Sequence, residues 1–294
     1  MMPVKIHKAG SFIAPLLRSN VDGKVIGITS KGIFVLFGDR VVFLTGNSID
    51  NPFSIQIDDP EEYPGGLALN TRASLADNHL RMGEWDLDLS SLTEIAPEPL
   101  PQVKAHAMKG TIVSQIVSIF QLLDRGGHED SCLFVVDALF NKRVPVDPAK
   151  QELWVAVRNL RQGTRAKDLA ACEDALKLIL GNGMGLTPSG DDITAGYLLI
   201  LNCLLNREGA VDEFTSQLNA LALELARKQT TWISANLIEA AIQRLVDERV
   251  GMAAMVLLNT CKMDPVTIAR KLESFGNSSG IDAFAGMAAA LLPA

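Results

Sequence analysis

Residues 25–45 read VIGITSKGIFVLFGDRVVFLT, and this stretch decides the fold of the first third of the chain. Three short runs, residues 25–29, 33–37 and 41–45, are rich in β-branched and aromatic side chains. The segments between them, 30–32 and 38–40, contain the glycine and small polar residues of tight turns. The stretch therefore predicts three antiparallel strands joined by hairpins.

Further strands are predicted on either side of a proline-rich break. Residues 53–58 and 85–89 alternate apolar with polar side chains, so each run should bury one face. Five or more antiparallel strands at this spacing predict a small barrel or sandwich. The sequence PEPLP at 97–101 can continue neither a strand ladder nor a helix, and we place the linker there.

After the linker the apolar period changes to that of helices. Ile112, Ile116, Ile119 and Leu122 form one stripe, and Trp154, Val157 and Leu160 form another. Further helices are predicted near 191–206, 212–228, 231–247, 265–274 and 281–292. The predicted fold class is α+β, with a β-rich amino-terminal domain of residues 1–100 and an all-helical carboxy-terminal domain of residues 101–294.

Composition argues against several classes of function. The 294 residues carry a net charge of −7, which disfavours binding to nucleic acid or to anionic membrane surfaces. The amino terminus shows no apolar signal core, and the longest apolar run, near 193–205, is too short to span a bilayer. We expect a cytoplasmic protein. The four cysteines and four histidines are scattered without metal-binding spacing, which predicts reduced buried thiols and no histidine-based zinc site.

The most informative segment is GNGMGLTPSGDD at residues 181–192. Alternate glycines allow positive φ and a close approach of the backbone to a ligand. Pro188 fixes one φ, and Ser189 is predicted to cap a helix beginning at Gly190, whose free N–H groups would form an anion site. No Gly-Lys-Ser/Thr follows and no strand precedes, so the segment is neither a Walker A loop nor a Rossmann turn.

Asp191 and Asp192 leave three interpretations open. They could hold Mg²⁺ that bridges to a phosphate. They could accept hydrogen bonds from the NH₂ of an amide or ureido group without a metal. They could instead only complete a capping box with Ser189.

Two other segments are candidates for ligand contact. Residues 279–286 repeat the pattern S-G-x-D-x-x-A-G of residues 189–196, and both copies precede an apolar helix. The two helix starts could converge on one pocket, or they could be unrelated core helices. Thr231 and Ser234 are predicted to share a helix face, where they could donate to a ligand or bond to their own backbone. No nucleophile with a local catalytic signature is present.

These motifs resemble those of a bacterial family of unknown function, loosely called carboxylases, that includes the AllH-type subunit of oxamate carbamoyltransferase from allantoin breakdown. The string from Gly183 to Asp192 carries the resemblance, with weaker blocks at Thr231-x-x-Ser234 and Gly276-x-x-Ser279-Gly280-x-Asp282. It runs over roughly residues 110–294. The β-rich part is similar only in general organisation. Gly190 stands where a histidine is expected in the purine-catabolic member, and the Ser-x-Arg-Thr phosphate motif of other carbamoyltransferases does not occur.

The resemblance implies a multi-subunit enzyme of purine catabolism that converts oxalurate and phosphate into oxamate and carbamoyl phosphate, or a paralogue acting on a related compound. Its substrate would be a small anionic or ureido molecule, and its partners would be other subunits. The candidate catalytic residues are Asp191, Asp192 and Asp282; the candidate substrate-binding residues are Gly183, Gly185, Thr187, Ser189, Gly190, Thr231, Ser234, Ser279 and Gly280. The alternative is a binding or regulatory module that recognises a small anion without catalysis.

Overall fold

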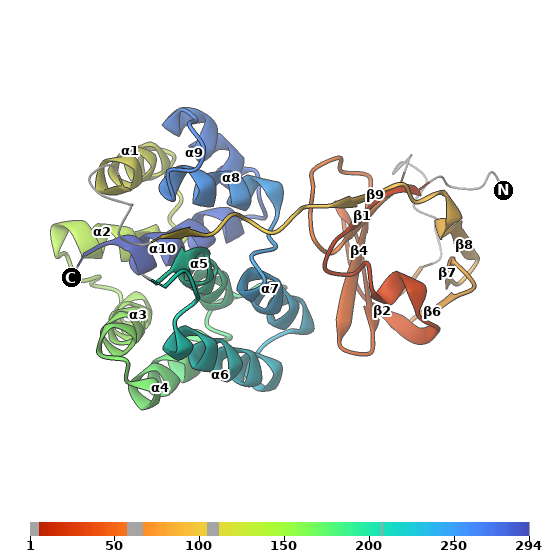
Figure 1. The fold of residues 1–294 in the computed structure, drawn as a ribbon, viewed down its shortest axis with the longest axis horizontal. Coiled ribbons are helices and arrows are strands. Elements are labelled where there is room, and N and C mark those ends of the chain that lie inside the picture. The colour runs from red at the N-terminus through yellow and green to blue at the C-terminus, as the bar shows by residue number, and fades with distance from the viewer. Residues whose placement is uncertain (1–5, 58–66, 105–111, 207, 294) are drawn as a thin grey trace. The chain divides into compact units, whose positions relative to one another are not determined.

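The computed structural model describes residues 6–57, 67–104, 112–206 and 208–293. The chain divides into two compact units, Met1–Glu98 with Leu245–Glu248, and Pro99–Arg244 with Arg249–Ala294. Strands dominate the first unit and helices the second (Figure 1), which confirms the α+β class. Asp58, at the end of a predicted strand, and the first five residues lie outside the described part.

The first unit is built on one curled sheet (Figure 1). Nine strands of the described part pair in the order β8-β7-β6-β2-β3-β4-β5-β1-β9. Their bounds are β1 (Ile6–Gly10), β2 (Val21–Thr29), β3 (Gly32–Phe37), β4 (Arg40–Thr45), β5 (Ser54–Ile57), β6 (Arg72–Ala76), β7 (His79–Met82), β8 (Trp85–Asp88) and β9 (Glu94–Ala96); 3₁₀ turns occupy Leu16–Arg18 and Leu89–Ser91.

The hairpins at 25–45 form as the sequence predicts. Thr29 Oγ1 donates a hydrogen bond to the Gly32 carbonyl oxygen at 3.1 Å and closes the β2–β3 turn. Gly32 has a φ of +151°, and a Cβ there would lie 2.1 Å from the Leu44 carbonyl oxygen, so glycine is required. Val25 and Val35 are fully buried. The sheet is not wholly antiparallel, however, because β4 pairs with β5 and β1 pairs with β9 in parallel.

The second unit is a helical array. Its helices are α1 (Ile112–Arg125), α2 (Leu133–Asn141), α3 (Pro148–Ala166), α4 (Leu169–Ile179), α5 (Ser189–Cys203), α6 (Glu213–Gln229), α7 (Trp232–Ile242), α8 (Glu248–Leu257), α9 (Pro265–Glu273) and α10 (Ser279–Leu291). α10 contacts α5, α2, α9, α1 and α3, and Figure 1 shows it in the middle of the array. Among the described helices, none combines the length and the apolar character that crossing a membrane requires.

Several helix boundaries differ from the sequence-based expectation. The helix expected over 191–206 ends at Cys203, because Leu204–Leu205 (β11) pairs in parallel with Val103–Lys104 (β10). The helix expected over 231–247 ends at Ile242, and Arg244 adopts a left-handed φ of +64°. Leu245–Glu248 then clusters with the first unit, where the Asp247 carboxylate accepts a hydrogen bond from the Asn51 amide at 3.3 Å.

Candidate functional site

The two S-G-x-D-x-x-A-G segments begin two helices, α5 and α10, that pack directly against each other. A Cβ atom at Gly196 would lie 2.0 Å from the Ala283 carbonyl oxygen, and a Cβ at Gly286 would lie 2.0 Å from the Ile193 carbonyl oxygen. The two glycines hold the last position of their segments, and Ile193 and Ala283 hold the fifth. The contact is therefore reciprocal, as an approximate local two-fold axis between the helices requires.

The reciprocity extends to the helix that precedes each segment. A Cβ at Gly190 would lie 1.9 Å from the Ile179 carbonyl oxygen at the end of α4. A Cβ at Gly280 would lie 2.2 Å from the Leu272 carbonyl oxygen near the end of α9. Both glycines thus allow a helix start to approach the end of the preceding helix. The pairs α4–α5 and α9–α10 share the same close approach of a helix start to the helix before it.

This arrangement buries a first-turn aspartate of each copy, Asp192 in α5 and Asp282 in α10. Asp192 is 3% exposed and Asp282 is fully buried. Burial raises the pKa of Asp192 well above its usual range, and the nearby charge of Asp282 raises it further, while the Ser279 hydroxyl acts in the opposite direction. Burial likewise raises the pKa of Asp282, against hydrogen bonds that include one from the Ser189 hydroxyl. Each serine thus acts on the aspartate of the other copy.

The two buried aspartates differ in the number of hydrogen bonds that their side-chain oxygens accept. Asp282 accepts a hydrogen bond from the Cys132 backbone N–H at 2.6 Å and one from the Ser278 hydroxyl at 2.8 Å. Asp192 Oδ2 and the Ser234 hydroxyl oxygen are buried without a hydrogen-bond partner among the described residues. Such a group destabilises a protein by about 1–3 kcal/mol, so Asp192 is poised to accept a donor that the chain does not supply.

Asp191 points away from this pair and braces the glycine-rich loop. Its Oδ1 accepts a hydrogen bond from the Gly181 N–H at 2.8 Å, and its Oδ2 accepts a short one from the Thr230 hydroxyl. Burial raises the pKa of Asp191, and these two donors lower it. A carboxylate engaged in this way holds the loop in place and has fewer free oxygens for a ligand.

We expect the Thr230→Val variant to lose stability because it leaves a buried carboxylate oxygen without its donor. The expected loss in the free energy of unfolding is about 1–3 kcal/mol at neutral pH, measured by urea titration. Thr267→Val removes the same hydroxyl-to-aspartate bond at the exposed Asp264, and there the loss should be smaller. Equal losses in the two variants would contradict the bracing role of Asp191.

Several N–H groups at the start of α5, where an anion site is predicted, already donate hydrogen bonds within the chain. Pro188 is the residue before α5, and no side chain caps the helix, so Ser189 neither caps it nor forms a capping box with Asp192. The Gly190 N–H donates to the Asn182 carbonyl oxygen at 2.8 Å, and the Asp191 N–H donates to the Pro188 carbonyl oxygen at 2.9 Å. The loop turns back on the helix and satisfies these donors internally.

The remaining predicted site residues lie around the same loop. Gly183 and Gly185 adopt φ of +119° and +99°, which glycine alone takes without strain. Thr187 Oγ1 lies 3.1 Å from Ser279 Oγ, so hydroxyls of the two copies meet. Thr231 precedes α7 and does not share its face with Ser234 as expected: it caps the helix by accepting from the Ser234 N–H at 3.1 Å and donates to the Leu186 carbonyl oxygen at 2.7 Å.

The interpretation of the aspartates as Mg²⁺ ligands finds little geometric support. The oxygens of Asp191 accept from an N–H and an O–H group, and those of Asp282 do the same. In the part of the chain that is described, no three histidine, cysteine or acidic side chains gather in a way that could hold a metal ion. Within the described residues, only Asp192 Oδ2 of the three carboxylates is left to accept a hydrogen bond, and this single free oxygen suits a ligand with N–H donors better than it suits a cation.

A comparison with family models bears directly on this pair of helix starts. Residues 179–291 match the model described as oxamate carbamoyltransferase subunit AllH. The AllH match begins at the last residue of α4 and ends at the last residue of α10, so it contains both helix starts and all of the predicted site residues. No solved structure matches the chain.

A cavity of about 310 Å³ lies beside the AllH-matched segment in the helical unit. Asn277 and Ser278 from the α9–α10 turn line one side. The other side comes from the α1–α2 loop, which lies outside the AllH match and contributes His128, Glu129 and others; the full lining is Gly127, His128, Glu129, Asp130, Ser131, Asn277 and Ser278. His128 was not predicted as a site residue, because no local pattern connects it with residues about 150 positions later.

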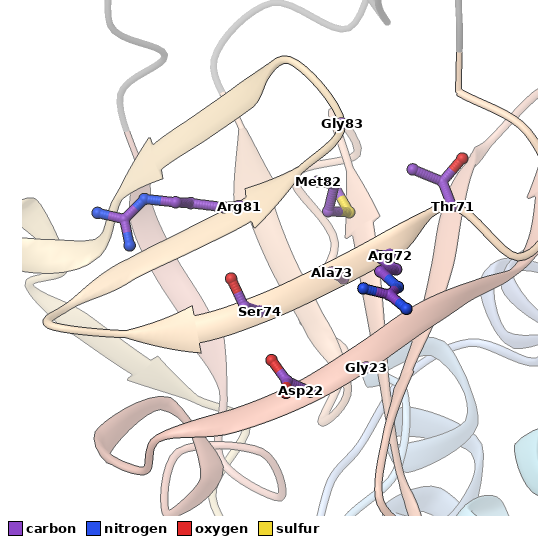
Figure 2. Close-up of a pocket in the computed structure, with 9 residues that line it drawn as sticks. All are labelled: Asp22, Gly23, Thr71, Arg72, Ala73, Ser74, Arg81, Met82 and Gly83. Atoms are coloured by element: carbon purple, nitrogen blue, oxygen red, sulfur yellow. The ribbon is translucent and has the colours of Figure 1, made fainter.

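A second hollow, of about 680 Å³, lies on the sheet of the first unit, outside the AllH match. Figure 2 shows Asp22, Ser74 and Arg81 on the neighbouring strands β2, β6 and β7. The Arg81 guanidinium donates to Asp86 at 3.3 Å, so its positive charge is paired. None of the predicted site residues lies here, and the lining combines exposed strand side chains with the buried Ala73 and Met82.

Proposed function

We propose that this chain is a subunit of a carbamoyl-transfer enzyme of the oxamate carbamoyltransferase type. Its reaction would be the conversion of oxalurate and phosphate into oxamate and carbamoyl phosphate in purine and allantoin catabolism, or the same transfer on a related small compound. The observation that carries the proposal is Asp192, a buried carboxylate with an oxygen that has no donor among the described residues, inside the AllH-matched segment.

The chemistry of a carbamoyl group suits this site. Its NH₂ supplies the hydrogen-bond donors that Asp192 lacks, and Asp282, Ser189 and Ser279 surround the same point with further polar atoms. A neutral amide can enter a low-dielectric site between two helices at a smaller desolvation cost than a charged phosphate. We assign Asp192 to binding the carbamoyl NH₂, with Asp282 beside it, and Asp191 to holding the loop.

Partner subunits belong to the same proposal. Met184 in the glycine-rich loop is 93% exposed, and Leu186 and Trp232 beside it are more than 40% exposed. Thr231 links this loop to the start of α7 through the Leu186 carbonyl oxygen, so the three apolar side chains lie on connected segments. Exposed apolar side chains next to a ligand site are typical of surfaces that another chain covers. We infer that the phosphate-binding residues come from such a partner.

A thermal-shift titration of the purified chain tests the proposal. We expect saturable stabilisation by oxalurate, oxamate or carbamoyl phosphate of about 3 kcal/mol at a hundredfold excess over Kd, and none by inorganic phosphate alone. The Asp192→Asn variant should lose the response, whereas Asp86→Asn, on the surface of the sheet unit, should keep it.

Co-purification with the partner chains and an assay of carbamoyl phosphate formation would then follow. Stabilisation by phosphate and other anions in both variants, without turnover in the assembled complex, would instead support a regulatory anion-binding module.

A further inference from the structure

The cavity beside α10 is connected to the buried aspartates through named hydrogen bonds. Ser278 lines the cavity and donates to Asp282 Oδ2 at 2.8 Å. Ser131 lines it from the other side, and the next residue, Cys132, donates its N–H to Asp282 Oδ1 at 2.6 Å. The Asp282 carboxylate therefore lies directly behind the cavity wall.

His128, on the same loop side of the cavity as Ser131, forms a histidine–glutamate pair with Glu273. His128 Nε2 lies 2.9 Å from Glu273 Oε1, and the two side chains are 26% and 32% exposed. Gly126 makes room for the pair, because a Cβ there would lie 2.6 Å from His128 Nε2 and 3.1 Å from Glu273 Oε1. A carboxylate that accepts from one imidazole nitrogen fixes the ring and leaves the other nitrogen for a ligand or a proton.

The charge around the cavity selects the kind of group that can enter. Glu129 and Asp130 line it, with Glu273 and Asp282 behind its walls. On the cationic side, Lys150 donates to the Glu129 carbonyl oxygen at 2.9 Å, and Arg249 donates to the Ser274 carbonyl oxygen at 2.8 Å. A net acidic wall of this kind repels carboxylate and phosphate groups and favours neutral groups rich in N–H donors.

We propose that this cavity binds the amide end of the ligand, with His128 as the residue that exchanges a proton with it and Glu273 as the positioning residue that orients the imidazole. The proposal rests on the proposed function and adds to it an acid–base group from outside the AllH-matched segment. The glycine-rich segment itself contains no histidine. His128, from the α1–α2 loop, lines the cavity together with Ser278, the residue before α10.

The proton balance of carbamoyl transfer requires one acid–base group, and His128 can fill that role. As a phosphate oxygen bonds to the carbamoyl carbon, the bond from that carbon to the amide nitrogen breaks. The leaving nitrogen gains a proton from protonated His128, the incoming hydrogen phosphate releases its proton to water, and the ring recovers a proton from water. The products are oxamate and carbamoyl phosphate, and His128 returns to its starting state.

Calorimetric titration of the full chain with two matched probes tests the inference. Oxamate and oxalate share one carboxylate and differ in that oxamate carries an amide where oxalate carries a second carboxylate. We expect oxamate to bind at least about tenfold more tightly than oxalate, with an affinity that depends on pH. His128→Gln should abolish that pH dependence, and Glu273→Gln should weaken it because the carboxylate no longer orients the imidazole.

The matched control is His79→Gln. His79 also pairs with a carboxylate, Asp86, at 2.6 Å, but in the sheet unit, so this variant should bind like the wild type. Equal binding of oxamate and oxalate, or an unchanged pH dependence in His128→Gln, would overturn the inference even if that variant were less stable. No oxamate binding would overturn it as well.

The inference and the proposed function can fail separately. Oxamate binding with the expected pH dependence, but no carbamoyl phosphate from the assembled complex, would support the inference about the cavity and refute the proposed reaction. Carbamoyl phosphate formation with the same pH profile of kcat in wild type and His128→Gln would support the proposed reaction and refute the role of His128.

Discussion

Replacing Gly196 by alanine is expected to destabilise the helical unit by more than about 3 kcal/mol, one of the two largest effects that we predict. The added Cβ would lie 2.0 Å from the Ala283 carbonyl oxygen, which is backbone and has no rotamer to change. The helices α5 and α10 would have to move apart, and the contact that holds both aspartates would open. Urea unfolding followed by circular dichroism measures the loss.

The reciprocal geometry gives this prediction a second, sharper form. Gly286→Ala should cost about as much as Gly196→Ala, because its Cβ would also lie 2.0 Å from a carbonyl oxygen, that of Ile193. The double variant should cost clearly less than the sum, since helices already forced apart by one methyl group admit the second more easily. Ala195→Ser, at a half-buried position one residue away, is the control and should change stability little. Additive effects would contradict the shared contact.

The Asp192→Asn variant is expected to be more stable than the wild type at neutral pH and to lose ligand binding. The pKa of Asp192 is raised well above its usual range in the folded chain, first by burial and then by the charge of Asp282. The folded chain thus holds a proton that the unfolded chain releases above about pH 3.9. Wild-type stability from this group is full below that pH and falls as the pH rises towards the folded-state pKa.

Asparagine cannot ionise, so the stability of the variant does not decrease with rising pH at this position. The two proteins should have similar stability near pH 4 and differ by about 1–3 kcal/mol at pH 7, which corresponds to a few degrees in Tm. Asp264→Asn is the control with the opposite sign, because hydrogen bonds from Thr267 lower the pKa of Asp264, so that variant should lose stability at neutral pH. An Asp192→Asn chain that is less stable than the wild type at pH 7 would show that the carboxylate is charged and well solvated.

A gain in stability together with a loss of binding in Asp192→Asn would mark Asp192 as a residue placed for a ligand. Groups placed for a ligand are often unsatisfied without it, and their removal stabilises the fold. Asp282, with two short hydrogen bonds to its carboxylate, and Asp191, with two donors of its own, are built into the structure. Asp192 is the one of the three whose Oδ2 lacks a partner among the described residues, which is why we assign it the central role.

The sequence by itself determined the elements whose local chemistry is strong. The hairpins of residues 25–45 follow from β-branched runs and glycine turns, and α3 follows from its apolar stripe, with Asp147 capping its start. The resemblance carried by residues 183–192 was confirmed by the AllH match, because glycine, proline and aspartate at fixed spacing are recognisable without a structure.

Elements whose environment is set by distant residues were not predicted. α2 is rich in residues such as Phe134, Val135 and Val136, which favour strands when taken alone. α8 buries alanine, valine and glycine around most of its circumference, so it shows no clear polar face from which a period could be read. Asp50 and Asn51 hold residues 247 and 248 in the sheet unit, a contact across almost 200 positions that local spacing does not encode.

The same division applies to the site. The sequence found the two repeated segments and left open whether they meet. Only the tertiary structure decided that Gly196 and Gly286 bring α5 and α10 together and that Asp191 braces the loop. It also decided that Asp192 Oδ2 lacks a hydrogen-bond partner among the described residues and that His128 and Ser278 line one cavity. The physical reason is that burial, desolvation and the distance between side chains depend on how helices pack, whereas a sequence pattern specifies only which residues share one helix or one turn.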